Sequence, residues 1–146
     1  MYAQVDQFAV DKFPNVLVEE GIAPHFIREF HRRRGRRCLR VEKNLGDLAQ
    51  SRKCDLVDTF GLKWEVKADR LWHVTGNVYV ELQALHASEA DYYLVFAGIA
   101  FVIAKSRLWE AIKGLDSVAG GDDMRSLGAK LPVERLEEFA EEVITP

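Results

Sequence analysis

The sequence has 146 residues, of which 48% are hydrophobic and 29% charged. These fractions are close to those of average globular proteins, which argues against a disordered chain, a collagen-like repeat and a disulfide-stabilised scaffold. The length predicts a single domain spanning 1–146. The net charge of −3 is unevenly distributed, because residues 1–73 carry 14 basic and 11 acidic side chains whereas residues 74–146 carry 6 and 12. The first half of the chain is therefore suited to a phosphate-bearing partner, although the net charge of the whole chain is negative.

The two cysteines, Cys38 and Cys54, have neither the spacing of metal ligands nor that of a secreted disulfide framework. The first residues lack the basic and apolar segments of a signal peptide. The longest apolar stretch, 92–104, is shorter than the roughly 20 residues that a membrane-spanning helix needs. We therefore expect a cytoplasmic protein that has no membrane partner.

The first third of the chain predicts helices and one short strand. Apolar residues recur every four positions over 16–30, which is typical of a helix with one buried face. Gly21 and Pro24 interrupt this pattern, and proline is favoured in a first helical turn. One helix is therefore expected to end near Gly21 and a second to cover 24–34, with Gly35 as its stop. The segments that follow are predicted as a strand over 38–41 and as a turn, or equally a short helix, over 44–47.

The rest of the chain predicts a sheet followed by helices. Apolar patterns of strand type occur at 55–58, 62–67, 77–82, 92–97 and 99–104. The connection 59–61 ends in glycine and suits a hairpin. We expect a helix over 106–112 with Ser106 as its N-cap, then a loop over 119–130 and an amphipathic helix over 132–144. This order predicts an α/β fold with a central mixed β-sheet of about five strands flanked by helices.

A group of charged residues lies on the predicted hairpin. Glu65 and Lys67 are two residues apart on one strand and share a face, while Asp55 begins the adjoining strand and can lie across from them. Mg²⁺ takes one or two carboxylates from a protein and keeps several waters, and a nearby lysine can orient or deprotonate a metal-polarised water. The pattern predicts hydrolysis of phosphodiester bonds, although the same Glu-x-Lys spacing also occurs on solvated strand faces.

Asp58 competes with Asp55 for the first acidic position. In a regular strand these two side chains point to opposite faces, so only one of them can meet Glu65. The ten-residue gap to Glu65 favours Asp55.

The run from Asp55 through Trp64-Glu65-Val66-Lys67-Ala68-Asp69 to Asp91-Tyr92-Tyr93 resembles the PD-(D/E)xK nuclease superfamily, in particular its small phage and bacterial members, over residues 55–96. The resemblance implies a restriction-endonuclease-like core and a DNA endonuclease that depends on Mg²⁺ or Mn²⁺, often as a homodimer in a bacterial or phage-infected cell. It also implies that Asp55, Glu65 and the carbonyl group of Val66 bind metal and that Lys67 assists the attacking water. We favour a Holliday-junction-resolvase-like enzyme, because a chain of this length has little room for sequence-reading elements.

The resemblance implies further acidic residues at the metal site. Many members of the superfamily carry a glutamate in the first helix, and this chain departs from them by having Pro24 or His25 at the matching place. Glu20 is our first choice for this role, ahead of three alternatives, Glu19, His25 and Glu29. Glu81, at the end of a predicted strand, is expected either as a second metal ligand or as a structural partner of Lys67.

Positive charge is concentrated between residues 32 and 40, where there are six arginines and no acidic residue. Arginine forks bind phosphate oxygens bidentately, so we expect contacts with the DNA backbone from Arg33, Arg34, Arg36 and Arg37. The alternative is that the cluster is only a solvated surface. The polar turn at Thr75 and Asn77 is expected either to contact substrate phosphate or only to reverse the chain. The alternative function is a catalytically silent nucleic-acid-binding or assembly module with the same fold.

Overall fold

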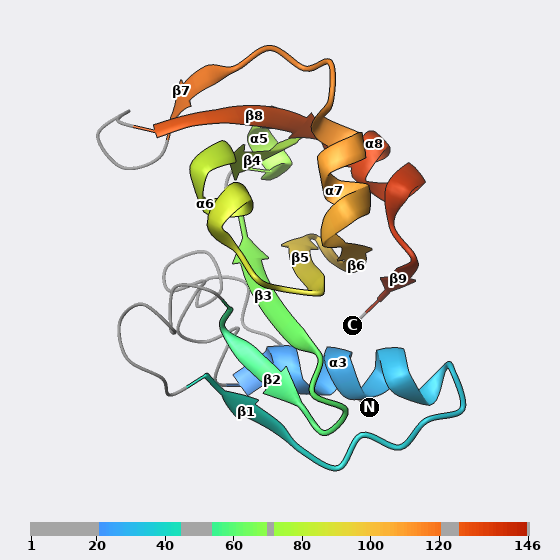
Figure 1. Cartoon of the computed structure of the whole chain (residues 1–146). Helices are drawn as coiled ribbons and strands as arrows, with labels where there is room; N and C mark the ends of the chain where they lie inside the picture. The colour runs from blue at the N-terminus through green and yellow to red at the C-terminus, as the bar shows by residue number, and fades with distance from the viewer. Residues whose placement is uncertain (1–20, 45–53, 70–71, 121–125, 146) are drawn as a thin grey trace.

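The computed structural model describes residues 21–44, 54–69, 72–120 and 126–145. Most of the predicted helix before Gly21 and most of the turn over 44–47 lie outside these ranges. None of the described helices is long and apolar enough to cross a membrane. Figure 1 shows the elements in chain order, which are α3 (Ala23–Arg32), β1 (Val41–Lys43), β2 (Leu56–Asp58), β3 (Lys63–Ala68), α5 (Trp72–Thr75), β4 (Asn77–Glu81), α6 (Leu82–Ala87), β5 (Tyr92–Ala97), β6 (Ile99–Ala104), α7 (Lys105–Ile112), β7 (Val118–Gly120), β8 (Ser126–Pro132), α8 (Val133–Phe139) and β9 (Glu142–Ile144).

Six of these strands form one mixed sheet in the order β1-β2-β3-β5-β6-β9. Neighbouring strands are antiparallel except β3 and β5, which run parallel. Strands β4, β8 and β7 form a second, antiparallel sheet. The predicted α/β class with a mixed central sheet is confirmed, with six strands rather than about five and with β4 in the second sheet instead of the central one.

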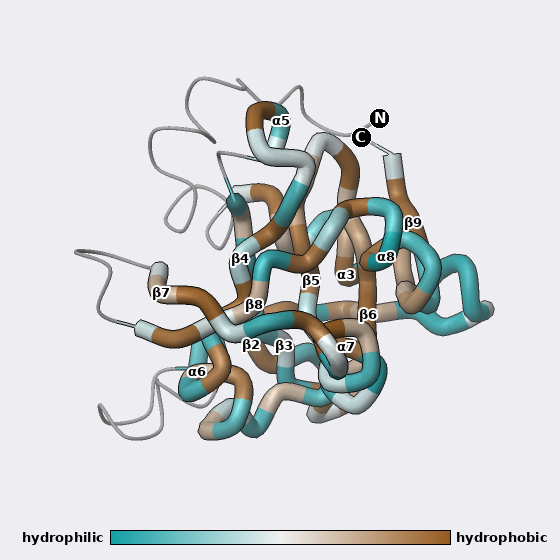
Figure 2. The backbone as a smooth tube through the Cα atoms, turned by 90° about the horizontal axis from the view of Figure 1, so that it is seen from above, coloured by the Kyte–Doolittle hydropathy of each residue, from teal (hydrophilic) through white to brown (hydrophobic). Residues whose placement is uncertain are grey.

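Both faces of the six-stranded sheet are covered (Figure 1). Helix α3 packs on one face, where Leu94 of β5 and Val102 of β6 belong to its core. The opposite face, which includes Val95 and Phe101, packs against the three-stranded sheet and helices α6, α7 and α8. In Figure 2 the hydrophobic colouring accordingly follows β5 and β6 through the middle of the molecule. The continuous apolar patterns of these two strands therefore reflect burial on both sides, as predicted.

Strands β2 and β3 form the predicted hairpin, with Leu56 opposite Trp64. Gly61 in the connection has a φ of 77°, a conformation that glycine adopts without steric cost. Trp64 and Val66 are buried in the core with α3. Because side chains alternate along a strand, Glu65 and Lys67 point to the other face of the sheet.

Two predicted boundaries differ from the structure near strand ends. Strand β1 begins at Val41 rather than at residue 38, because its partner β2 ends at Asp58 and the Arg40 N–H donates to Thr59 Oγ1 instead. Helix α7 has Ala104 as its N-cap, without a side-chain cap. The predicted N-cap, Ser106, lies inside the first turn, since β6 runs directly into the helix.

The C-terminal quarter differs more strongly from the prediction. The segment 119–130, expected as a loop, contains the end of β7 and most of β8, and β8 pairs with β4. The helix expected over 132–144 ends at Phe139, and β9 follows it at the edge of the central sheet, with Ile144 opposite Ala100. The errors at β8 and β9 arise because β8 pairs with β4 and β9 pairs with β6, partners that are distant in the sequence, and short-range patterns do not report such pairing.

Candidate active site

Asp55 directly precedes β2 and is held against β3 by hydrogen bonds. Its N–H donates to the Trp64 carbonyl at 2.9 Å, and its own carbonyl accepts from the Asn44 N–H at 2.9 Å. Its Oδ2 accepts from the Val66 N–H at 2.8 Å. The Asp55 carboxylate therefore lies beside the part of β3 that carries Glu65, as expected from the hairpin.

Glu65 and Lys67 point from β3 toward the second sheet. Protein atoms fully enclose Glu65 Oε2. Burial lowers the pKa of the Lys67 ammonium, because the charged amine loses its hydration; the negative charges of Asp69, Glu81 and Glu65 act in the opposite direction but are the smaller effects. Lys67 therefore releases its proton more readily than an exposed lysine does, a property found in lysines that exchange protons during catalysis.

A small cavity of about 120 Å³ lies between β3, β5, β4 and α6, with room for several water molecules. Its polar lining comprises Glu65, Lys67, Glu81 and Tyr93, and its apolar lining comprises Val66, Val80, Ala84 and Leu85. Glu81 is the last residue of β4, and α6 begins directly after it. The junction of strand and helix thus brings a further carboxylate to the cavity that Glu65 and Lys67 share.

Two further residues belong to this site, although the sequence assigned them no role. Tyr93 lines the cavity, and the charge of Asp69 acts on Lys67. Tyr93 lies opposite Glu65 in the parallel pair of β3 and β5. Burial raises the pKa of Tyr93 to about 12, with a smaller contribution from the charges of Glu65 and Asp55 and an opposing one from a hydrogen bond with Ser88. With this pKa, the Tyr93 hydroxyl stays protonated at neutral pH.

Asp69 follows β3, accepts a hydrogen bond from the Tyr79 N–H at 2.9 Å and favours the charged form of Lys67.

The oxygen donors of this site suit a hard divalent cation. Asp55 and Glu65 supply carboxylates from adjoining parts of the hairpin, and Glu81 supplies one from β4. Within the described ranges, no group of three or more His, Cys, Asp or Glu side chains is arranged to hold a metal ion. Mg²⁺ commonly binds through only one or two carboxylates and keeps several waters, a number that Asp55 and Glu65 supply without Glu81.

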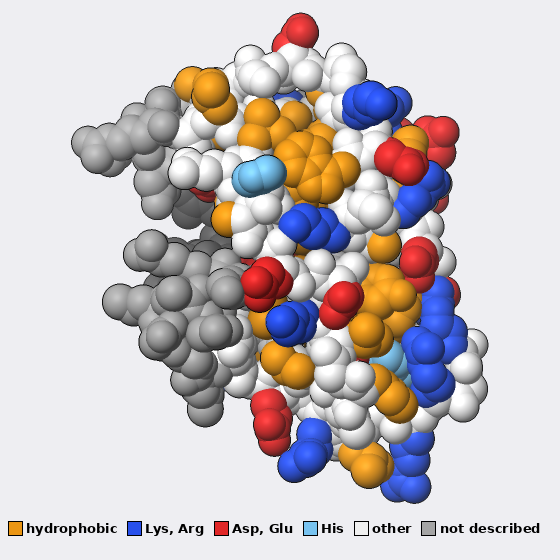
Figure 3. Space-filling model, in the orientation of Figure 1, with side chains coloured by type: hydrophobic (Ala, Val, Ile, Leu, Met, Phe, Trp, Pro, Cys, Tyr) orange, Lys and Arg blue, Asp and Glu red, His pale blue; other side chains and the backbone are white. Residues whose placement is uncertain are grey.

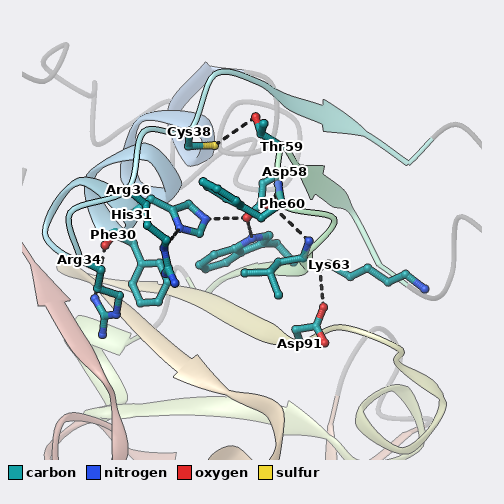
Figure 4. Close-up of polar contacts among 12 residues, drawn as sticks. Phe30, His31, Arg34, Arg36, Cys38, Asp58, Thr59, Phe60, Lys63 and Asp91 are labelled. Carbon is teal, nitrogen blue, oxygen red and sulfur yellow. Dashed lines mark hydrogen bonds and ion pairs between the residues drawn. The ribbon is translucent and has the colours of Figure 1, made fainter.

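Asp58 belongs to a different cluster, on the α3 face of the hairpin (Figure 4). Its carboxylate is buried and accepts four hydrogen bonds, from His31 Nε2 at 2.7 Å, Trp64 Nε1 at 2.9 Å, Phe60 N at 2.8 Å and Leu62 N at 3.1 Å. His31 Nδ1 in turn accepts from Arg36 Nε at 3.1 Å. The expected placement of Asp55 and Asp58 on opposite faces is therefore confirmed.

Of the four helix residues considered as completing the metal site, only His25 and Glu29 are among the described residues, and neither lines the cavity. Glu20 and Glu19 lie outside the described residues. Glu29 instead forms ion pairs with Arg32 at 2.5 Å and Arg33 at 3.1 Å. His25 is exposed and lines a pocket on the outer side of α3.

The arginines expected to contact DNA divide into two groups. Arg33 and Arg34 form ion pairs with Glu142 of β9, at 2.7 and 3.2 Å, and so link the end of α3 to the sheet edge. Arg36 hydrogen-bonds to His31, while Arg37 is exposed. Figure 3 shows Lys and Arg side chains gathered along the edge of the molecule where α3 ends and the next loop begins.

Thr75 and Asn77 form the turn between α5 and β4. Thr75 Oγ1 accepts from the Asn77 N–H at 3.1 Å, and Asn77 Nδ2 donates to the Thr75 carbonyl at 3.1 Å. Gly76 between them has a φ of 72°. These contacts reverse the chain, and the expected contact with phosphate stays a prediction.

No protein-family model matches the chain, and no curated protein matches it. The resemblance over residues 55–96 therefore stays a prediction.

Proposed function

We propose that the chain is a metal-dependent DNA endonuclease that hydrolyses phosphodiester bonds at the cavity beside Lys67. The observation that supports this proposal is the meeting of Asp55, Glu65 and Lys67 on one side of the β2–β3 hairpin, with Glu81 across the cavity. Carboxylates that can hold a divalent cation, next to an amine that can orient or deprotonate a water, suit metal-assisted phosphodiester hydrolysis.

The residues have distinct proposed roles. Asp55 and Glu65, with the carbonyl group of Val66, would hold Mg²⁺ or Mn²⁺. Glu81, across the cavity, would act on Lys67, whose charged form it favours. A bound divalent cation stabilises charge on a phosphoryl oxygen and lowers the pKa of its water. Lys67 orients the attacking water or takes its proton, since burial lowers the pKa of its ammonium group.

The proposed substrate is branched DNA, such as a Holliday junction, cut by a homodimer. The support is the resemblance over residues 55–96. Sedimentation of the protein alone and with junction DNA tests the dimer. Faster cutting of a four-way junction than of linear duplex of the same sequence tests the preference.

Lys67→Met tests the proposed chemistry, and Lys63→Met is a matched control. Both lysines lie on the same face of β3, but Lys63 pairs with Glu89 at 3.6 Å and does not line the cavity. On supercoiled, linear and branched DNA with Mg²⁺, Lys67→Met should cut about 10²–10⁴-fold more slowly than wild type, and Lys63→Met should cut like wild type. A wild type that neither cuts DNA nor binds Mn²⁺, or equal cutting rates for wild type and Lys67→Met, would contradict the proposal.

Measurements on the same protein sample distinguish the nuclease from the alternative, a silent nucleic-acid-binding module. A silent module binds DNA, cuts none of the three substrates and does not respond to Mn²⁺. A nuclease that lacks only the correct substrate still binds Mn²⁺ through Asp55 and Glu65. Metal binding therefore distinguishes a wrong substrate from a wrong function.

A further inference from the structure

A second and larger pocket, of about 590 Å³, lies on the outer side of α3. Its lining is mostly basic and comprises His25, Arg28, Glu29, Arg32, Arg36, Arg37 and Cys38. The opposite side of α3, including Phe26 and Phe30, is buried against the central sheet. Since Glu65 and Lys67 point from the other face of that sheet, the helix and the sheet separate this pocket from the candidate active site.

The path of the chain after α3 builds the second wall of the pocket. Gly35 has a φ of 70°, which lets the chain turn sharply. The Arg36 N–H then donates to the His31 carbonyl at 2.9 Å. The chain thus folds back on the end of α3, and Arg36 and Arg37 join the helix residues around one pocket.

Two of the four arginines are fixed in place by neighbours. Glu29 accepts from Arg32 through both of its oxygens, at 2.7 and 2.5 Å, and these hydrogen bonds lower the pKa of Glu29 to about 2, so that the pair stays charged. Arg36 donates to His31, which is itself held by the buried Asp58 (Figure 4). A guanidinium that is already positioned loses less entropy when it binds an anion.

The other two arginines of the pocket have no acidic partner among the described residues. Arg28 and Arg37 are exposed, and neither makes a hydrogen bond or an ion pair within the described part of the chain. Arg33 and Arg34, which lie between them in sequence, are paired with Glu142. The pocket therefore combines four arginines with a single carboxylate and keeps a strong excess of positive charge.

We propose that this pocket binds the phosphate groups of a nucleic acid backbone, at a site separate from the cavity beside Lys67. Four arginines around one pocket exceed what a single phosphate needs. Arg28 and Arg32 lie about 6 Å apart along the helix axis at 1.5 Å per residue, and a row of cations along a helix is typical of contacts with a polyanion. Because the two sites lie on opposite sides of the sheet, they hold different segments of backbone.

The inference shares its nucleic acid partner with the proposed function but not the cleavage step. Contacts with phosphate position a nucleic acid without reading its sequence. The site therefore adds affinity for any sequence. It is tested without divalent cations, so that binding is measured where no metal-dependent cutting takes place.

The experiment compares two double variants that each remove two positive charges. Arg28→Gln with Arg37→Gln changes the pocket, and Arg107→Gln with Lys113→Gln changes exposed residues at α7. Binding of a short labelled DNA duplex of random sequence is followed by fluorescence anisotropy in EDTA while NaCl is raised from about 50 to about 200 mM. Thermal unfolding of each variant serves as the check on folding.

The pocket variant should bind the duplex at least about tenfold more weakly than wild type. The negative slope of log K against log salt should become less steep by about 2, because two phosphate contacts are lost. The control variant should stay within about twofold of wild type. Equal losses in the two variants, or none in the pocket variant, would overturn the inference.

Titration with inorganic phosphate, followed by calorimetry, tells whether the pocket binds a nucleic acid backbone or only a small anion. If the pocket variant loses affinity for inorganic phosphate but binds the duplex like wild type, the pocket is a small-anion site and the inference is wrong. If the pocket variant loses affinity for the duplex while wild type neither cuts DNA nor binds Mn²⁺, the inference stands and the nuclease proposal fails by itself.

Discussion

The β2–β3 hairpin carries a polar cluster on each face, and the two clusters differ in how their charges are used. On the α3 face, Asp58 accepts four hydrogen bonds from side-chain and backbone donors, all within 3.1 Å. On the opposite face, Glu65, Lys67 and Glu81 line a cavity, and burial there lowers the pKa of Lys67. The first cluster is a filled network of donors and acceptors; the second places charges around space that a ligand can occupy.

This difference separates a structural role from a chemical one. A buried and fully hydrogen-bonded network stiffens the fold, and the Asp58 network joins α3 to the turn of the hairpin. Charged groups that share a cavity with shifted pKa values are typical of functional sites. Asp55 and Asp58 are only three residues apart, so the strand alternation alone assigns them to these different roles.

The largest effect on stability is expected from Asp58→Ala. The substitution leaves His31, Trp64 and two backbone N–H groups of the turn without their acceptor in the protein interior. The free energy of unfolding, measured with urea, should fall by about 3 kcal/mol. Asp55→Ala removes the hydrogen bond from the Val66 N–H and should cost about 1 kcal/mol. Equal losses for the two variants would contradict the contrast between the clusters.

Strands built from local patterns were predicted well from the sequence. The hairpin of β2 and β3 depends on alternation and on Gly61, and β5 and β6 depend on continuous apolar runs around Gly98. The meeting of Asp55 with Glu65 follows from the same hairpin. These features involve residues that are close in sequence, so periodicity is enough to predict them.

The rest of the site depends on pairing between distant segments. Tyr93 lies next to Glu65 because β3 and β5 pair in parallel, and Glu81 reaches the cavity because β4 leaves the central sheet to pair with β8. The same cause explains why β8 and β9 were not predicted. Apolar patterns indicate that a strand is buried, but they do not identify its neighbours.

Alkaline pH gives a second way to test the cavity. An unfolded chain ionises tyrosine near pH 10, whereas the folded protein holds the Tyr93 proton until about pH 12. The stability from this difference is fully present below about pH 10 and is lost as pH rises toward 12. Wild type should therefore lose more unfolding free energy over this range than Tyr93→Phe, measured by urea unfolding at each pH. Identical pH dependence would show that Tyr93 is not enclosed as described.

The smallest effect is expected where neither cluster is involved. Arg33 and Glu142 form an ion pair at 2.7 Å, but their side chains are 34% and 24% exposed. A double-mutant cycle with alanine at both positions should give a coupling energy of about 0.5 kcal/mol, and added salt should weaken it. A coupling as large as the Asp58 effect would mean that the link between α3 and β9, rather than the Asp58 network, is the main anchor of the helix.

Binding of Mn²⁺, followed by calorimetry, tests the central claim that Asp55 and Glu65 form the metal site of a nuclease. Wild type should bind the ion, and Asp55→Asn and Glu65→Gln should each weaken binding by about tenfold or more. Glu110→Gln, at an exposed glutamate of α7 that pairs with Arg107, should bind like wild type. No binding by wild type, or equal affinity in all four proteins, would contradict the account.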